Sequence, residues 1–423
     1  MRTSLWLLLI ASAGLTIALA GCGGSGSPIT GTPPGNTTVG YNFSGGTPTA
    51  AAVQIGTGSF AAATLQSGAL TVTIPDRTTN YSVAYVCPPT PGFGNTVTSE
   101  FVIQASTKDG TSFNVSCQGS TATTGALTGS VDATAIPGAA NVQIRGNLGY
   151  GTAVGASSGT FNVTLPTGSN DVALLVMDGS PIPNVLAVKI LRSQTVPGAL
   201  NNGTVVTFQA SDQTTSQPLS VTNVPTGFVT PPAVAVQYFT ANGTAFLLEG
   251  NSATQYPAVP AGAAQSGDYY AFESISDDAT TYNSAVGITQ YTTTPGNPAT
   301  LALPAPWSFA GPSAATLPTF TFTYSGFSVL TAVAQSGEIE WATTATTLNT
   351  ITAIATANFQ GSATTVAIPD LSSVTGFIPP AASGATIYWV ADVFGGTAQE
   401  FSFTPSNNSS LSFVQNEGTY IEP

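Results

Sequence analysis

The sequence predicts an all-β protein built from tandem β-sandwich units. Apolar residues alternate with threonine in many short stretches, which is the pattern of strands with one buried face. The 45 glycines and 30 prolines separate these stretches at even spacing, as turns do in sandwiches. After residue 22 no stretch shows three turns of amphipathic helix. The ambiguous region 332–354 is rich in Thr and Ile, which favour strands.

The chain opens with a segment that resembles the signal peptide of bacterial lipoproteins. Arg2 gives a positive start, residues 5–20 are apolar, and Leu19-Ala20-Gly21-Cys22 matches the lipobox of that family. This apolar run is shorter than the roughly 20 residues that span a bilayer, so we expect it to be cleaved. The alternative is an ordinary secretory signal in which Cys22 is incidental.

The lipoprotein resemblance implies that residues 1–21 are removed and that Cys22 carries the membrane anchor. Its sulfur would take a diacylglyceryl group and its freed amine a fatty acid such as palmitate, because stable anchoring requires more than one acyl chain. Gly23 stands where an aspartate would favour the inner membrane, which implies the outer membrane. Residues 22–38 are rich in Gly, Ser and Pro and are expected to form a flexible tether.

A recurring signature divides the remainder of the chain into units. Its two clearest copies, offset by 91 residues, are 68–75 followed by 81–87 and 159–166 followed by 172–177. Weaker copies surround Pro260 and Pro369. In each copy an alternating strand ends at a proline, which has no N–H for the ladder, and a strand buried on both faces follows. The predicted β-sandwich units are 39–122, 123–225, 226–316 and 317–423.

The second unit resembles the carboxypeptidase-regulatory-like modules of the transthyretin type. The likeness lies in Gly129-Ser130-Val131 and in the run GTFNVTLPTG at 159–168, and it covers residues 129–179. It departs from the pattern at Asn170-Asp171, where an aromatic residue is common before the next strand. Modules of this family are small β-sandwiches that accompany other domains. The resemblance therefore implies Ig-like or transthyretin-like units and assigns no activity to them.

Composition excludes several classes of function. The chain of 423 residues has no histidine, so neither an imidazole-based catalytic triad nor an imidazole metal site can form. The last of its six basic residues is Arg192, and its net charge is −13. Such a chain has no clustered Lys and Arg with which to bind nucleic acid. With few ion pairs to lose, the fold is expected to persist near pH 3, although solubility should fall near the pI of about 4.1.

Cys87 and Cys117 are the two cysteines that remain after the anchor. In an exported chain such a pair is expected to be oxidised, so we predict a disulfide between them. Closing this loop would stabilise the fold by about 3–4 kcal/mol in the loop-entropy description. The alternative is a free, reactive thiol.

Glu338 and Glu340 are the candidate catalytic pair. On an extended strand they would share one face about 7 Å apart. Carboxyl groups at this separation suit an inverting glycosidase, with Trp341 as a platform for a sugar ring. The alternative is an edge strand whose charges prevent pairing with other chains.

Tryptophan residues offer a second kind of candidate site. The three beyond the signal segment are Trp307, Trp341 and Trp389. Clustered on one surface, they could stack on sugar rings. Trp389 lies inside an apolar run and is expected in the core, whereas Trp307 lies in a proline-rich joint and is expected to be exposed.

Acidic residues in the third unit are a candidate calcium site. Asp277 and Asp278, with Asp268 and Glu273 nearby, could supply oxygen ligands to Ca²⁺. The EF-hand spacing is absent, and a solvated acidic loop is the alternative. We therefore predict neither a metal site nor a cofactor.

These patterns together predict a non-enzymatic lipoprotein of the bacterial cell envelope. It would be held to the outer membrane through Cys22 and serve surface display, adhesion or binding of an extracellular or envelope polymer. The alternative is an accessory protein that binds or processes saccharides. That function would use the carboxylates and tryptophans of the last two units, namely Glu338, Glu340, Trp307 and Trp341.

Overall fold

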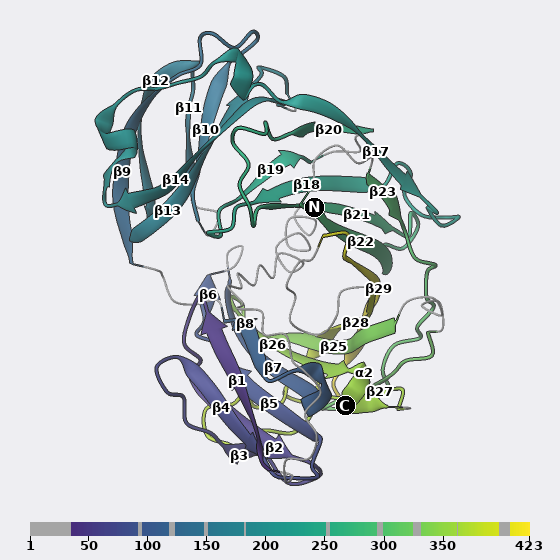
Figure 1. Cartoon of the computed structure of the whole chain (residues 1–423). Coiled ribbons are helices and arrows are strands. Elements are labelled where there is room, and N and C mark those ends of the chain that lie inside the picture. Colours follow the sequence, from purple (N-terminus) through teal and green to yellow (C-terminus); the bar gives the residue numbers. More distant parts are fainter. Residues whose placement is uncertain are drawn as a thin grey trace.

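Strands make up nearly all the regular structure of the chain. The computed structural model describes residues 35–91, 95–117, 123–147, 151–181, 183–250, 254–293, 299–324, 331–361, 363–396 and 407–423. The α-helix of these residues, α2 (Ala357–Gln360), is a single turn. The all-β prediction is confirmed, and the strands form four successive units (Figure 1).

The first two units have the following strands. The first comprises β1 (Thr37–Ser44), β2 (Ala50–Ile55), β3 (Ala61–Ala62), β4 (Ala69–Ile74), β5 (Asn80–Val86), β6 (Thr90–Pro91), β7 (Thr96–Ser106) and β8 (Ser112–Ser116). The second comprises β9 (Thr124–Asp132), β10 (Asn141–Arg145), β11 (Gly151–Val154), β12 (Ser158–Pro166), β13 (Gly168–Met177), β14 (Val185–Val196), β15 (Gly198–Ala199) and β16 (Val206–Thr207).

The last two units follow the same plan. The third comprises β17 (Thr215–Thr222), β18 (Ala233–Phe239), β19 (Ala245–Glu249), β20 (Gln255–Ala258), β21 (Tyr269–Asp277), β22 (Ser284–Thr292) and β23 (Ala299–Ala302). The fourth comprises β24 (Thr319–Thr321), β25 (Thr331–Thr344), β26 (Thr347–Thr356), α2, β27 (Thr365–Ala367), β28 (Thr386–Gly396) and β29 (Ser410–Ile421).

Every unit repeats one arrangement of strands, with a small sheet and a four-stranded set. The small sheets run β4-β1-β8, β12-β9-β15, β20-β17-β23 and β24-β27. The four-stranded sets run β3-β2-β5-β7, β11-β10-β13-β14, β19-β18-β21-β22 and β26-β25-β28-β29. In the first three units the first strand pairs antiparallel with one neighbour and parallel with the last strand. The sequence repeat is therefore a repeat of topology.

The recurring signature marks the step from one sheet to the other. β4 ends directly before Pro75, and β5 follows in the four-stranded set. The same step joins β12 to β13, β20 to β21 and β27 to β28. Because proline cannot donate to a ladder, it stops the first strand where the chain must leave its sheet.

The four-stranded sets of three units join edge to edge into one sheet of 13 strands, which includes β6. β22 of the third unit pairs antiparallel with β29 of the fourth. β26 of the fourth unit pairs in parallel with β7 of the first, from Thr347 opposite Thr96 to Ala355 opposite Gln104. The first and last units are thus neighbours, and the strands curve around a centre (Figure 1).

The hydrophobic cores show that the units also pack face to face. The first and second units each have a core between their two sheets. A third core combines the interiors of the third and fourth units with the outer faces of the four-stranded sets of the first and second. On β13, for example, Val172 and Leu174 belong to the second unit's core, whereas Ala173 and Leu175 belong to the shared one.

Strand pairing groups β17 with the third unit, although the predicted boundary between residues 225 and 226 lies after it. Its partners are β20 and β23. The proline-rich stretch after β17 is therefore a connection between the two sheets of one unit. A proline-rich turn looks the same in sequence whether it lies inside a unit or between two units.

The fourth unit lacks a parallel partner for its first strand among the described residues, and aromatic side chains of the incoming linker pack into its core. The ring of Trp307 stacks on Phe322 with centroids 5.4 Å apart, and Phe309 meets Trp389 edge-on at 5.4 Å. Asn416 on β29 donates a hydrogen bond to the Trp307 carbonyl oxygen at 2.9 Å. Trp307 is consequently only 6% exposed, so the expectation that it is exposed is wrong. Its proline-rich surroundings indicated a joint but not that the joint is packed inside.

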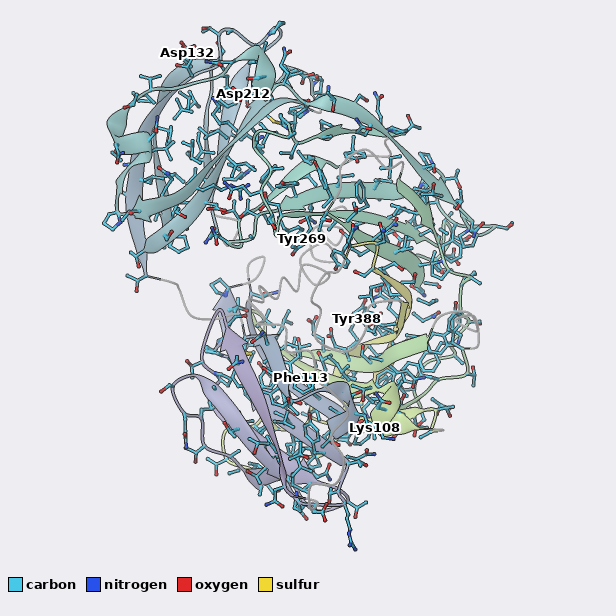
Figure 2. The ribbon with its side chains drawn as sticks, viewed as in Figure 1. Lys108, Phe113, Asp132, Asp212, Tyr269 and Tyr388 are labelled. Atoms are coloured by element: carbon cyan, nitrogen blue, oxygen red, sulfur yellow. A yellow bond between two sulfur atoms is a disulfide. The ribbon has the colours of Figure 1, made fainter. Side chains whose placement is uncertain are left out.

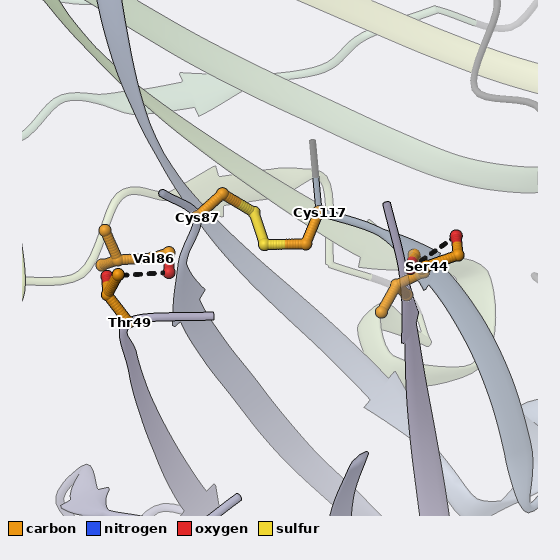
Figure 3. Close-up of a disulfide and its surroundings, with 6 residues drawn as sticks. Ser44, Thr49, Val86, Cys87 and Cys117 are labelled. Carbon is orange, nitrogen blue, oxygen red and sulfur yellow. Dashed lines mark hydrogen bonds between the residues drawn. A yellow bond between two sulfur atoms is a disulfide. The ribbon is translucent and has the colours of Figure 1, made fainter. Parts of the chain in front are cut away.

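The predicted disulfide between Cys87 and Cys117 is present and joins the two sheets of the first unit (Figure 3). Cys87 directly follows β5 and Cys117 directly follows β8, and their Cα atoms lie 5.4 Å apart. Both residues are buried in the first unit's core. The bond therefore links the strand ends where the two sheets approach each other.

Candidate functional site

Glu338 and Glu340 lie in the middle of the long sheet. β25 pairs with β26 on one side and with β28 on the other, so it is not an edge strand and edge protection does not explain its charges. Ile339 and Trp341 point into the core, and the two glutamates, each half-buried, occupy the opposite face. This alternation is what a strand with one buried face requires.

Further carboxylates share that face of the sheet. Strand pairing forms one row of residues across the sheet, in the order Ser336 (β25), Asp392 (β28), Gln415 (β29), Ala285 (β22) and Asp277 (β21). The neighbouring row contains Glu417, Val390, Glu338 and Thr352. We call this surface the acidic face and define it by Asp277, Glu338, Glu340, Asp392 and Glu417.

Hydroxyl and amide groups donate hydrogen bonds to these carboxylates. Thr352 donates to Glu338 at 2.8 Å, and Thr350 donates to Glu340 at 3.4 Å. Asp392 accepts from Ser336 at 3.1 Å and from Gln415 at 3.0 Å. The Tyr388 hydroxyl donates to Glu417. Figure 2 shows Tyr388 and Tyr269 on the inner side of the curve made by the sheet.

The surroundings of the acidic face favour protonated carboxyl groups. Burial raises the pKa of Glu338 to about 7, with Asp392 and Glu340 adding to the effect against the Thr352 hydrogen bond. Burial likewise raises the pKa of Asp392 to about 7 and that of Asp277 to about 6, and the charge of Glu417 contributes to both. Burial also raises the pKa of Glu340. Such groups can act as proton donors near neutral pH.

The tryptophans do not form a surface for stacking on sugar rings. Trp341 and Trp389 are 4% and 7% exposed, and both belong to the core shared by the third and fourth units. The prediction that Trp389 lies in the core is confirmed. Because Trp341 points away from Glu338 and Glu340, it does not lie on the acidic face with them.

The carboxylates considered for calcium lie in separate environments. Asp268 accepts hydrogen bonds from Arg192, Tyr238 and the backbone. Asp278 is in a turn, where it accepts from the backbone N–H groups of Thr280 and Thr281. Within the described ranges, no three side chains of the metal-binding types gather as a metal ion requires.

An ionic cluster that the sequence did not reveal joins the second and third units. Arg192 of β14 donates to Asp171 at 2.9 Å and to Asp268 of the third unit at 2.5 Å. The side chains of Asp171 and Asp268 are 0% and 2% exposed. Asn242 donates to Asp171 at 3.0 Å, and Arg192 also donates to the carbonyl oxygen of Ala263 at 2.8 Å. The sequence feature that could have indicated this cluster is Arg192, because no other basic residue follows it in the sequence.

The predicted anchor at Cys22 and the tether before residue 35 lie outside the described residues. Among the residues that are described, no helix has the length and apolar character needed to cross a bilayer. The disulfide between Cys87 and Cys117, which we predicted on the expectation of export, is present in the structure.

Comparison with known proteins gives only distant structural likenesses. No protein-family model and no curated protein matches the chain. The chain is similar to the Bacillus anthracis TIE protein with a TM-score of 0.15 and 10% identity, over 63% of this chain and 50% of that one. It is similar to a leucine-rich repeat protein from Bacteroides thetaiotaomicron VPI-5482 with a TM-score of 0.16 and 12% identity, over 41% and 26%. At these TM-scores neither likeness supports a function.

Proposed function

We propose that this protein is a lipid-anchored lipoprotein of the bacterial cell envelope that works as a rigid, non-enzymatic binding scaffold. Cys22 would hold it to the outer membrane, and the residues between Cys22 and β1 would form its tether, which is shorter than the predicted 22–38 because β1 begins at Thr37. Its role would be surface display, adhesion or binding of an envelope polymer. The lipobox supports the anchor, and the disulfide is compatible with an oxidising compartment.

The observation that carries the scaffold proposal is the continuity of the fold. One sheet runs through three units, and one core includes residues from all four. Units that only moved as beads on a string would not share strand ladders and apolar faces. A shared body instead holds the outer surfaces of its units in fixed positions, as a binding scaffold requires.

We assign the units to the transthyretin type of β-sandwich within this proposal. Support comes from the strand orders, in which a small sheet runs fourth-first-last and a set of four runs third-second-fifth-sixth, where the short β6 that pairs with β7 is not counted. This order recurs in the first three units, and the fourth repeats it without the last strand among its described residues. The resemblance read from residues 129–179 would then extend to the whole chain.

Protease treatment of intact cells tests the anchor and the display together. The wild-type protein should be degraded from outside, whereas Cys22→Ala should lose its attachment to the outer membrane. Protection of the wild type until the outer layer is opened would place the units in the periplasm and favour envelope binding. Attachment that survives Cys22→Ala would overturn the anchor.

A saccharide-processing function is the second candidate, because one observation favours it. Glu338 and Glu340 share a half-buried face at strand spacing, and burial raises the pKa of Glu338 to about 7. That combination suits a general acid facing a second carboxylate. Glu338→Gln and Glu340→Gln should each abolish hydrolysis of a polysaccharide if this function holds. If the protein is a scaffold alone, and its polymer docks away from the acidic face, either variant should bind the polymer as well as the wild type does.

A further inference from the structure

We propose that one end of the first unit is a lipid-facing surface, where Arg77 and Lys108 contact anionic headgroups of the membrane that holds Cys22. We call it the tether end and define it by the turn at residues 75–79 and the 3₁₀ turn η1 (Thr107–Asp109). The proposal rests on the proposed lipid anchor. It adds which side of the protein faces the bilayer and which groups make the contact.

The chain enters the folded body at the tether end. β1 begins at Thr37, whose register partner is Ile74, the last residue of β4. Directly before β1, the side chain of Asn36 accepts a hydrogen bond from the backbone N–H of Asp76 at 3.4 Å. The segment that leads back to the predicted anchor therefore leaves the body beside the turn that contains Arg77.

The length of this segment keeps the tether end near the membrane. Thirteen residues, from Gly23 to Gly35, separate Cys22 from Asn36. As a random coil they would span roughly 20 Å. The attraction between cations and headgroups acts over about 8 Å at physiological salt. The end of the body where the tether begins is thus the part that meets the headgroups most often.

Backbone contacts hold η1 beside the turn at 75–79. The N–H of Thr107 donates a hydrogen bond to the carbonyl oxygen of Thr79 at 2.8 Å. The side chains of Arg77 and Lys108 are both exposed to solvent. Two exposed cations, one from each turn, therefore lie at the same end of the first unit.

Two aspartates at this end do not cancel the cations. Asp76 lies 3.7 Å from Arg77, and an exposed pair of this kind is weak because water screens it. Asp109 is buried and accepts hydrogen bonds from Thr356 at 2.6 Å and from Asn358 at 2.6 Å, both of the fourth unit. The two turns therefore present more positive than negative charge to solvent.

The remainder of the folded chain is less suited to an anionic surface. In the second unit Lys189 pairs with Asp212, Arg192 binds two buried aspartates, and Arg145 donates to Gln143. The third and fourth units contain no lysine or arginine. Each Lys or Arg close to an anionic bilayer favours contact by a factor of about five. The tether end is therefore the part of the body that anionic lipid attracts.

Amine labelling of the protein on vesicles tests this surface, because the chain beyond the signal segment has two lysines, Lys108 and Lys189. The chain from Cys22 onward is coupled through the Cys22 thiol to a maleimide lipid, since its other two cysteines are joined in the disulfide. On vesicles that contain phosphatidylglycerol, an amine reagent should modify Lys108 about fivefold more slowly than on phosphatidylcholine vesicles. Lys189 is the internal reference and should keep its rate. High salt should remove the difference.

Two charge-removing variants identify the groups responsible. Arg77→Gln should raise the rate of Lys108 labelling on the anionic vesicles toward the rate on the neutral ones. Arg145→Gln removes the same charge from the second unit and should leave the rate of Lys108 labelling unchanged. Equal Lys108 rates on the two kinds of vesicle, or a slowing of Lys189 as large as that of Lys108, would overturn the proposal.

Chemical coupling keeps this test separate from the test of the anchor. If attachment to cells survives Cys22→Ala, the anchor fails, whereas the labelling rates still report which surface faces anionic lipid. If attachment is lost in Cys22→Ala but Lys108 labels equally fast on both kinds of vesicle, the anchor stands and the lipid-facing surface does not.

Discussion

Arg192 links the second and third units through two buried ion pairs. Its guanidinium group binds two buried aspartates from different units, and one of them, Asp268, also accepts a hydrogen bond from Tyr238 at 2.8 Å. A buried ion pair need not stabilise a fold more than apolar residues would. Removing one partner, however, leaves charges in a place that water does not reach.

Arg192→Met should therefore destabilise the protein by about 3–5 kcal/mol, because Asp171 and Asp268 would remain buried without their cation. Urea unfolding followed by circular dichroism measures this difference. Arg77→Met is the matched control, since Arg77 pairs with Asp76 at 3.7 Å with its side chain 89% exposed. The control should change stability by less than about 1 kcal/mol. Similar small effects in both variants would show that the ionic cluster is not needed.

At the scale of elements, the linker before β24 contributes aromatic side chains to the core of the fourth unit. Its residues Trp307 and Phe309 fill the space between the two sheets of the fourth unit. In the other units β8, β15 with β16, or β23 pairs in parallel with the first strand, and the described residues of the fourth unit include no such strand. The fourth unit therefore departs from the repeated plan in its small sheet, and its core includes side chains from the linker.

Trp307→Ala should destabilise the fourth unit by about 3–5 kcal/mol, as expected for a large side chain removed from a core. Trp307→Phe, which retains a ring to stack on Phe322, should cost less than half of that. Thermal unfolding of both variants measures the ranking. If alanine and phenylalanine at this position behaved alike, the linker would be a covering loop and not part of the core.

The sequence predicted strands, repeats and the disulfide because these depend on local patterns. Alternation along β25 placed Glu338 and Glu340 on one face, and the predicted export of the chain led to the pairing of Cys87 with Cys117. The joining of β7 to β26 was not predictable, because a strand at the edge of a sheet has the same pattern as one in the middle. The acidic face was missed for the same reason, since Asp277, Asp392 and Glu417 come together only through that kind of pairing.

At the scale of the whole molecule, two sets of carboxyl groups respond to pH in opposite directions. Those of the acidic face have raised pKa values, so they destabilise the fold when ionised. Others have lowered values: Asp171 through its hydrogen bonds to Asn242, Ser193 and Arg192, which outweigh its burial, and Asp278 through backbone N–H groups. Stability held by the second set is present above the ordinary carboxyl value and is lost as the pH falls below it.

The free energy of unfolding should therefore rise as the pH falls from 8, reach a maximum near pH 4–5 and decline below about pH 3.5. Urea unfolding at a series of pH values measures this curve. The maximum lies close to the pI of about 4.1, where the net charge vanishes and solubility is lowest. Measurements at low protein concentration keep aggregation from hiding the effect. A maximum above pH 7 would contradict the assignment of the raised pKa values.

The ladder between β7 and β26 also determines when the protein can finish folding. β7 belongs to the first unit, which leaves the ribosome before the fourth unit that contains its partner β26. Contacts between such distant parts of a chain form slowly, because a long loop must close before they gain anything. Until the fourth unit arrives, one edge of the first unit has no strand beside it and is exposed to mispairing. We therefore expect this edge of the first unit to be most prone to mispairing during the time between the synthesis of β7 and that of β26.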